Sequence, residues 1–353
     1  MGYSGGTWLG AYYATYFPNR VGRFVLDANA EFTARWQKVF GNQPLGFQRR
    51  FEVDFLSYVA AHDDYFHLGA SAVEVNQAYE GLRSQLAAEP LDLDEGVTVY
   101  PADLDLLISG AMYSKTYFQG AAEEIRALAD LAARRTPAAG DVRAQQRRKI
   151  MAERVRRARE LDRFHGHLPL APDAYDPTFL QIICNDTPWQ GDRQSQLADS
   201  LAAGQSYPPR GWYALGDPCL SWRRPAVDLV TPTGEGLPPV LMVQTGRDPA
   251  TPVEGAVAAE AAFAPARMLR VTDEGDHGSY ALDGNECVDG IVEAYLVDGL
   301  VPDENSTCPG QPIPDPVPLS EEPRGLVDLL DHALGTAADR VARLTRLLGP
   351  LPI

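Results

Sequence analysis

Short apolar segments that predict buried strands occur in two parts of this chain, near its start and again after residue 236. They alternate with segments whose apolar residues recur at helical spacing. The strand-like segments are 21–27, 237–245 and 268–271. The helical segments next to them are 7–17, 253–263 and 286–298. Such an alternation predicts a parallel sheet flanked by helices, which is the α/β class.

The chain between residues 31 and 220 has a different pattern, because helical spacing dominates it and strand-like runs are absent. The helical segments are 51–59, 73–86, 104–107 and 121–131. After a break at 136–140, an arginine-rich helix is expected over 141–162, and such a charge run is typical of a solvated helix face. Because this region is inserted between core strands, we expect a large helical cap over an active site.

Residues 309–353 are expected to form a separate tail. Six prolines between Pro309 and Pro323 indicate a stiff linker, and apolar residues then recur at helical spacing over 326–348. The polar face of this helix mixes aspartate with arginine, which favours docking on protein over binding to a membrane. The predicted domains are core 1–30, cap 31–220, core 221–308 and tail 309–353.

The composition is that of a globular protein with an acidic surface. With 353 residues, 45% of them hydrophobic, the chain can bury a sizeable core. A formal net charge of −17 argues against nucleic acid and anionic membranes as partners. Since no run of 18 uninterrupted apolar residues occurs, no membrane span is predicted.

The start of the chain carries the pattern Gly-x-Ser-x-Gly, in Gly2-Tyr3-Ser4-Gly5-Gly6. In a nucleophile elbow this pattern forms a tight turn between a strand and a helix, with the serine in a strained conformation. The flanking residues must be small because the strand and the helix approach closely. The predicted helix and strand that follow have the order expected after an elbow. Ser4 is therefore the candidate nucleophile, and the Gly5 N–H is the candidate oxyanion donor.

Two further candidates, Asp248 and His277, each follow a predicted strand late in the chain. Open α/β sheets place their sites at this end of their strands. With Ser4 they give the order Ser, Asp, His of a hydrolytic triad. In that scheme Ser4 attacks a carbonyl carbon, His277 transfers the proton and Asp248 fixes the imidazole.

Asp27, at the end of the strand predicted at 21–27, is the alternative acid. Asp248 is preferred because the sequence Gly-Arg-Asp-Pro-Ala-Thr-Pro around it follows a fully apolar strand. The other histidines give no metal-site pattern: His165 and His167 have no acidic or cysteine neighbours. His62, His67 and His332 lie in predicted helical segments. The predicted chemistry needs no metal and no cofactor.

The four cysteines are Cys184, Cys219, Cys287 and Cys308. Their number is even and none lies in a C-x-x-C motif, which argues against a zinc or redox site. Pairing in sequence order would give two disulfides, of which the second closes a loop of about 20 residues and contributes about 3 kcal/mol. Disulfides imply export. The alternative is four buried thiols in a cytosolic protein.

Several motifs together carry a family resemblance. They are Gly2–Gly10, Phe17–Asp27, Gln244–Pro252, Gly275–Tyr280, Asn285–Val288 and Ile182–Asp186. The chain up to Cys308 resembles the secreted tripeptidyl aminopeptidase group of α/β-hydrolases. This resemblance implies an exported or cell-surface, disulfide-bonded serine exopeptidase that releases short peptides, tripeptides in this group, from free N-termini through an acyl-enzyme. In such enzymes a cap carboxylate typically holds the substrate's α-ammonium. Asp186 is a candidate for that role, and the alternative is a turn residue beside a disulfide.

The resemblance has a gap at the start of the chain. Members of the group carry a long segment before the elbow, which supplies most of the sheet, a Gly-rich loop with the second oxyanion donor, and a signal peptide. We therefore expect an N-terminally truncated member with a partial sheet, unless a second chain completes the core. Loss of one oxyanion donor alone costs ~10²–10³ in rate. The alternative functions are an inactive fragment that serves as a binding or interaction module, and an esterase on the same core.

Overall fold

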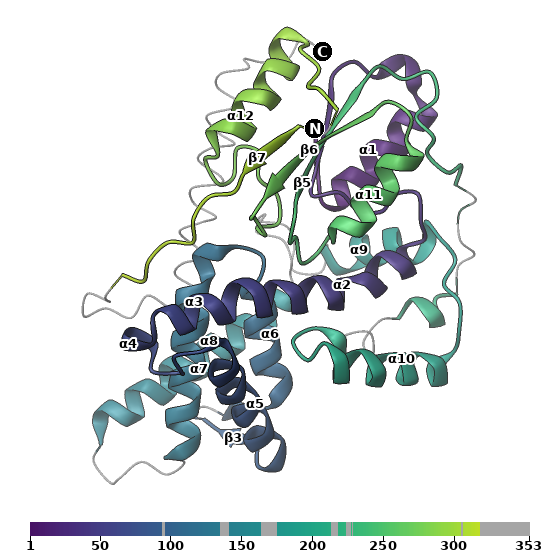
Figure 1. Ribbon diagram of the computed structural model, residues 1–353. Helices are drawn as coiled ribbons and strands as arrows, with labels where there is room; N and C mark the ends of the chain where they lie inside the picture. Colours follow the sequence, from purple (N-terminus) through teal and green to yellow (C-terminus); the bar gives the residue numbers. More distant parts are fainter. Residues whose placement is uncertain are drawn as a thin grey trace. The chain divides into compact units, whose positions relative to one another are not determined.

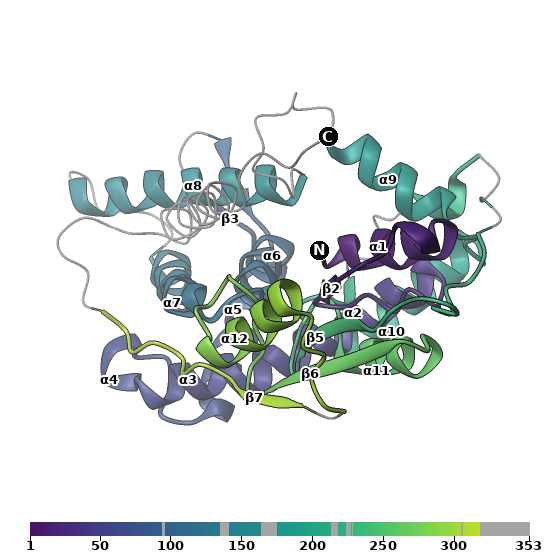
Figure 2. The same cartoon turned by 90° about the horizontal axis from the view of Figure 1, so that it is seen from above.

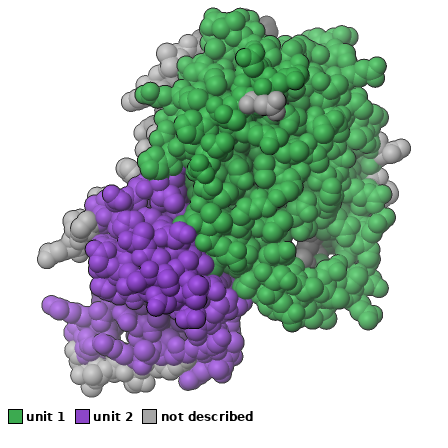
Figure 3. Space-filling model, in the orientation of Figure 1, with its two compact units in different colours: residues 1–54, 112–114, 173–312 green, residues 55–111, 115–172, 313–353 purple. Residues whose placement is uncertain are grey.

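The computed structural model describes residues 1–93, 96–134, 141–163, 175–212, 218–223, 227, 229–304 and 306–317. The chain divides into two compact units, which Figure 3 colours separately. Unit 1 consists of residues 1–54, 112–114 and 173–312, and unit 2 of residues 55–111, 115–172 and 313–353. The division into core, cap and tail that was predicted from the sequence assigns roles to segments of the chain. The two compact units do not test those roles, so that division stays a prediction.

Unit 1 contains a five-stranded, wholly parallel sheet in the order β1-β2-β5-β6-β7, of which Figure 1 labels β5, β6 and β7. Its strands are β1 (Gly2–Tyr3), β2 (Phe24–Asp27), β5 (Val240–Thr245), β6 (Ala266–Thr272) and β7 (Thr307–Pro309). The sheet confirms the predicted α/β-hydrolase fold class. It also adds two strands to the three that were expected. Both are short, since β1 has two residues and β7 has three.

Helices cover both faces of the sheet, with α1 and α11 on one face and α12 on the other (Figures 1 and 2). The helices of unit 1 are α1 (Gly5–Tyr16), α2 (Trp36–Arg50), α9 (Tyr175–Asn185), α10 (Arg193–Ser206), α11 (Val253–Ala262) and α12 (Glu286–Glu293). A π-helical turn, Ala294–Asp298, continues α12, and the 3₁₀ turns are Pro18–Arg20 and Cys219–Ser221.

The alternation of side chains along the strands explains why both faces are apolar. Leu26 and Met242 pack on the face covered by α1 and α11, whereas their neighbours Val25 and Leu241 pack on the face covered by α12. Successive strand residues point to opposite faces, so a strand that is buried on both faces is mostly apolar. All six residues of β5 are buried, and only the last two, Gln244 and Thr245, are polar.

Two disulfides connect elements of unit 1. Cys184, in α9, pairs with Cys219, and Cys287, in α12, pairs with Cys308 in β7. The pairing in sequence order is therefore confirmed, and the alternative of four free thiols is wrong. The second disulfide ties the short edge strand β7 to the helix that covers the same face.

Unit 2 is mainly helical. Its helices are α3 (Leu56–Ala61), α4 (Asp63–Phe66), α5 (Ala72–Ala88), α6 (Pro101–Ala111), α7 (Phe118–Ala133) and α8 (Val142–Arg163). A π-helical turn over Phe51–Phe55 precedes α3, a 3₁₀ turn over Lys115–Tyr117 precedes α7, and a small hairpin joins β3 (Leu91–Asp92) to β4 (Thr98–Val99). The helix α5 begins at Ser71, whose Oγ accepts the Glu74 N–H as an N-cap.

The arginine-rich helix α8 is held within unit 2 by several of its arginines. Arg159 forms an ion pair with Asp103, and Arg148 donates to the carbonyl of Asp92. The apolar side of α8 is buried at Met151 and Val155. The helix therefore combines a charged face with a packed face. The predicted tail helix over 326–348 lies outside the described residues, and among those described the helices are too short or too polar to cross a bilayer.

Candidate active site

The elbow predicted at the start of the chain is a strand–turn–helix in the structure. Ser4 lies between β1 and α1 with φ 52° and ψ −121°, a region that a residue with a side chain rarely occupies. A Cβ on Gly2 would lie 2.3 Å from the carbonyl oxygen of Gly6, so a side chain at Gly2 is sterically excluded. The Ser4 carbonyl accepts from the N–H and the hydroxyl of Thr7. These contacts hold the strained turn.

The N-terminus of α1 begins directly at this turn. Gly5 is its first residue and is exposed. The first N–H groups of a helix have no intrahelical acceptor, and the helix dipole is positive there. The Gly5 N–H can therefore donate to an anionic oxygen that develops next to Ser4 Oγ.

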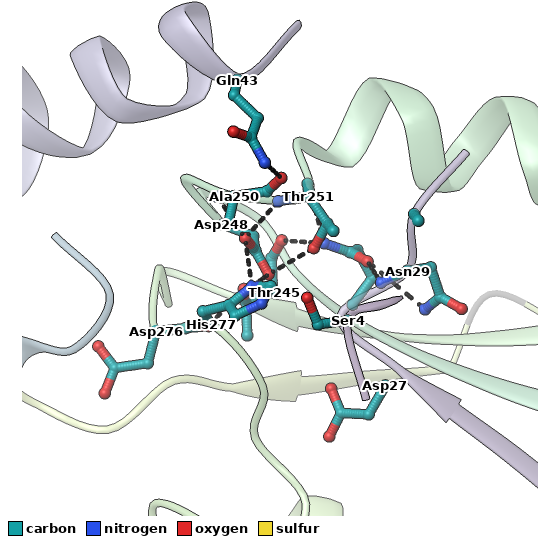
Figure 4. Close-up of polar contacts among 12 residues, drawn as sticks. Ser4, Asp27, Asn29, Gln43, Thr245, Asp248, Ala250, Thr251, Asp276 and His277 are labelled. Atoms are coloured by element: carbon teal, nitrogen blue, oxygen red, sulfur yellow. Dashed lines mark hydrogen bonds and ion pairs between the residues drawn. The ribbon is translucent and has the colours of Figure 1, made fainter. Parts of the chain in front are cut away.

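Asp248 and His277 form a direct pair. The imidazole Nδ1 lies 2.9 Å from both carboxylate oxygens of Asp248, which is fully buried (Figure 4). The turn after β5 also supplies three donors to this carboxylate: the N–H groups of Ala250 and Thr251 and the Thr251 hydroxyl. These donors fix the direction of the carboxylate, so it can fix the orientation and the tautomer of the ring.

The surroundings of His277 favour its charged form. Burial lowers the pKa of the imidazole, but the charge and hydrogen bond of Asp248 and the charge of Asp27 outweigh it, so the pKa is raised above its ordinary value of 6.5. The backbone N–H of His277 donates to the Tyr113 carbonyl at 2.9 Å, and the Tyr113 ring lies edge-on to the imidazole. Asp248 thus holds the imidazole at Nδ1, and the Tyr113 carbonyl holds the backbone of His277.

Ser4 lies beside the imidazole in Figure 4. In the part of the chain that the structure describes, neither Ser4 Oγ nor His277 Nε2 forms a hydrogen bond. Catalytic hydrogen bonds are often long in a ligand-free site and tighten when substrate binds. The Asp248–His277 bond and the position of Ser4 in Figure 4 together place the three residues at the carboxyl ends of β1, β5 and β6.

Asp27, the alternative acid, does not contact the imidazole. Its Oδ2 accepts the backbone N–H groups of Ser279 and Tyr280, at 3.1 and 2.8 Å. Burial raises the pKa of Asp27 to about 7; the two backbone N–H groups lower it, and the charge of Asp248 adds to the rise. In this structure it is Asp248 that bonds to the imidazole.

A buried polar network behind the acid was not anticipated from the sequence. Gln244 donates to the Thr251 carbonyl and accepts the N–H of Asn29, and Asn29 donates to the Val243 carbonyl. The network links the loop after β2 to the loop that carries Asp248. The turn itself had a sequence signal, because an aspartate commonly accepts backbone N–H groups of its own turn, as Asp248 does from Ala250 and Thr251.

A buried ion pair lies next to His277. Arg50, at the end of α2, bonds to Asp54 and to Asp276, the residue immediately before His277. The hydroxyl of Ser114 donates to the other oxygen of Asp276 at 3.0 Å. No local pattern marks Arg50, since it is the last residue of α2 and lies far from His277 in sequence.

Asp186 lies just after α9 and is half-buried. Its Oδ2 accepts the indole N–H of Trp8, one turn along α1 from Ser4, at 3.2 Å. Burial raises the pKa of Asp186, and the hydrogen bond from Trp8 opposes the rise. The carboxylate is therefore anchored to the helix that begins at Ser4. His165, His167 and His332 lie outside the described residues.

The sequence is similar to known hydrolases. Residues 208–308 match the family described as TAP-like protein. The tripeptidyl aminopeptidase of Streptomyces lividans is 30% identical over 330 residues, which are 90% of this chain and 55% of that protein. The serine protease Hip1 of Mycobacterium tuberculosis is 26% identical over 326 residues, which are 87% of this chain and 57% of that protein.

A shorter similarity extends to another activity. Carboxylesterase B of Mycobacterium tuberculosis is 31% identical over 156 residues, which are 40% of this chain and 27% of that protein. The chain spans little more than half the length of the tripeptidyl aminopeptidase and of the Hip1 protease.

Proposed function

We propose that the chain is a member of the tripeptidyl aminopeptidase group of α/β-hydrolases, to which it is similar, and that it carries the catalytic residues of a serine peptidase. The observation that supports this most directly is the bond between His277 Nδ1 and the Asp248 carboxylate, with Ser4 beside the ring on a strained elbow. A serine hydroxyl is a weak nucleophile until a positioned base takes its proton.

The reaction follows from the positions of these groups. Ser4 Oγ attacks the substrate carbonyl carbon while His277 Nε2 takes the hydroxyl proton. Asp248 holds Nδ1–H and stabilises the imidazolium, and the Gly5 N–H donates to the oxyanion. The imidazolium then protonates the leaving amine, which departs and leaves an acyl-enzyme. Water, activated by the same imidazole, releases the acyl group and restores Ser4.

The proposed substrates are peptides with a free N-terminus, from which a short peptide, a tripeptide, is released. The name of the S. lividans relative supports this specificity. Asp186 is our candidate for the group that receives the substrate's α-ammonium, because its carboxylate is half-buried and anchored to α1 near the elbow. A charge-assisted hydrogen bond of this kind would select for an unblocked N-terminus.

An esterase on the same core is the second candidate, and the similarity to carboxylesterase B supports it. The same three side chains cleave esters and amides, so the triad does not separate the two activities. The rates on an unblocked tripeptide anilide, the same anilide with an acetylated N-terminus, and a simple acyl ester would separate them. A peptidase that reads the N-terminus prefers the first substrate over the other two, and an esterase prefers the ester.

The test of the serine is labelling with a fluorophosphonate, with Ser4→Ala as the control. We expect the chain to be labelled at Ser4 and the control not to be labelled. Asp248→Asn should fold but label far more slowly, because the imidazole loses the acceptor that fixes its tautomer. A folded chain that does not label would contradict a catalytic role and favour a binding or interaction module.

Export from the cytosol is proposed from the two disulfides, which persist in oxidising compartments. Thiol titration of the protein from its native source, denatured without reductant, should find no free thiols among the four cysteines. Four titratable thiols would contradict export.

A further inference from the structure

Asp27 contacts both the elbow and the loop that carries His277. Its backbone carbonyl accepts the Ser4 N–H at 3.0 Å, and its side-chain Oδ2 accepts the N–H groups of Ser279 and Tyr280. The residue is fully buried at the end of β2. One residue therefore links the peptide of Ser4 to the peptides two and three residues beyond His277.

We propose that Asp27 is a positioning residue that sets the place of the His277 imidazole relative to Ser4 by holding the loop after β6 against the elbow. This inference rests on the proposed function. It assigns to Asp27 a role distinct from that of Asp248, which contacts the imidazole directly.

The backbone of this loop takes conformations that need support from outside the loop. Gly278 has φ +90° and Ala281 has φ +59°, so the chain passes twice through the left-handed region within four residues. The amides of Ser279 and Tyr280 have the Asp27 carboxylate as their acceptor, and buried amides without an acceptor are costly. Without that acceptor the loop would have to refold to satisfy them.

Tyr3 holds the next peptide group of the same loop. The phenol donates to the Tyr280 carbonyl at 2.7 Å, and Tyr3 is the residue immediately before Ser4. Burial, with the charge of Asp27, raises the pKa of Tyr3, so the phenol remains a donor. The elbow thus contacts the loop through Tyr3, and β2 contacts it through Asp27.

The second carboxylate oxygen of Asp27 lacks the partner that a carboxylate in an ion pair would have. Oδ1 is buried and has no hydrogen-bond partner among the described residues. The titratable groups that interact electrostatically with Asp27 are Tyr3 on β1, Asp248 after β5 and His277 on the loop. No permanent cation is among them. The structure therefore favours a role as hydrogen-bond acceptor, which an uncharged amide could also perform.

The test compares Asp27→Asn, which keeps a carbonyl oxygen in the same place, with Asp27→Ala, which removes it. On the hydrolysed substrate we expect Asp27→Ala to lower kcat about 10- to 100-fold, because a displacement of ~1 Å at the base has that effect, while KM changes less than threefold. Asp27→Asn should restore kcat to within a few-fold of the parent. Asp289→Ala is the matched control, because Asp289 accepts the Ala281 N–H of the same loop but does not contact the elbow; its kcat should stay within a few-fold.

A second readout does not depend on hydrolysis. Hydrogen exchange of the Ser279 and Tyr280 amides should be slow in the parent chain and in Asp27→Asn, and fast in Asp27→Ala. If Asp27→Ala does not fold, the exchange rates of the parent and Asp27→Asn decide alone.

Three results would overturn the proposal: rapid exchange of these amides in the parent, an unchanged kcat in a folded Asp27→Ala, or an Asp27→Asn as impaired as Asp27→Ala. The last would mean that charge, and not the acceptor, matters. Absence of Ser4-dependent labelling in the parent would instead contradict the proposed function, and the exchange measurement would still test whether Asp27 holds the loop.

Discussion

The end of β2 and the loop after β5 each place an aspartate at the same edge of the sheet, Asp27 and Asp248. The carboxylates of these two residues differ in what they bind. Asp248 receives three donors from its own turn and then binds the imidazole of His277. Asp27 receives two backbone amides from the loop after β6, and its Oδ1 has no partner among the described residues. Both residues were candidates for the acid of the triad because each lies at the end of a strand. They differ in which groups donate hydrogen bonds to them.

The donors also bear on the charge of Asp27. Asp248 accepts four hydrogen bonds, one of them from His277, whereas Asp27 accepts two, both from backbone amides. For Asp27, burial outweighs these two donors, and the pKa rises to about 7. Asp27 is therefore a group that titrates near neutral pH.

The largest expected effect is the contrast between Asp248→Asn and Asp27→Asn. Asparagine at 248 cannot hold the reactive tautomer of His277, so kcat should fall about 10⁴-fold. Asparagine at 27 can still accept the Ser279 and Tyr280 amides, so kcat should fall only a few-fold. Steady-state kinetics on the hydrolysed substrate measure both. Similar losses in the two variants would remove the distinction between the loops.

The strands and the triad order could be predicted from the sequence because they depend on local patterns. The runs that contain β2, β5 and β6 are mostly apolar, and each candidate lies at the end of a strand or follows it. By contrast, β7 was missed because Thr307–Pro309 is short, contains a proline, and is a strand only through its pairing with β6. Arg50 and Tyr113 were missed for the same reason, since only the fold brings them to His277. The catalytic roles of Ser4, Asp248 and His277 stay a prediction.

A smaller effect is expected at Thr251, which belongs to the Asp248 loop alone. Thr251→Val keeps the shape but removes the hydroxyl that donates to Asp248 Oδ2 at 2.9 Å. Loss of one partner of a buried charged group costs about 1–3 kcal/mol, so kcat should fall about tenfold and urea unfolding should show a similar loss of stability. Thr251→Ser retains the hydroxyl and should recover most of both. Equal behaviour of the two variants would show that this donor does not orient the acid.

The stability of the Asp27 loop should depend on pH in a direction set by its raised pKa. The folded chain binds a proton on Asp27 near pH 7, whereas the unfolded chain binds it only near pH 4. Between these values the folded state holds more protons, so this group stabilises the fold increasingly as the pH falls from about 7 towards 4. Asparagine at 27 does not titrate. The Tm of the parent minus that of Asp27→Asn should therefore increase as the pH is lowered from 8 to 5. A decrease would contradict the raised pKa of Asp27 in the folded chain.

The smallest expected effect is a shift in the pH at which His277 becomes protonated and no longer acts as the base. Both aspartates contribute to this pH. His277 acts as a base only when neutral, so kcat/KM should rise with pH through an inflection above 6.5, the ordinary value for histidine. Asp248 and Asp27 both raise this pKa, Asp248 more strongly. Asp27→Asn removes the weaker contribution, and the inflection should move to lower pH while the maximal rate changes little. Asp289→Asn, on the far side of the same loop, should leave the inflection in place. An inflection that stays in place in Asp27→Asn would mean that the Asp27 charge does not act on the imidazole, and that Asp27 affects His277 only through the loop backbone.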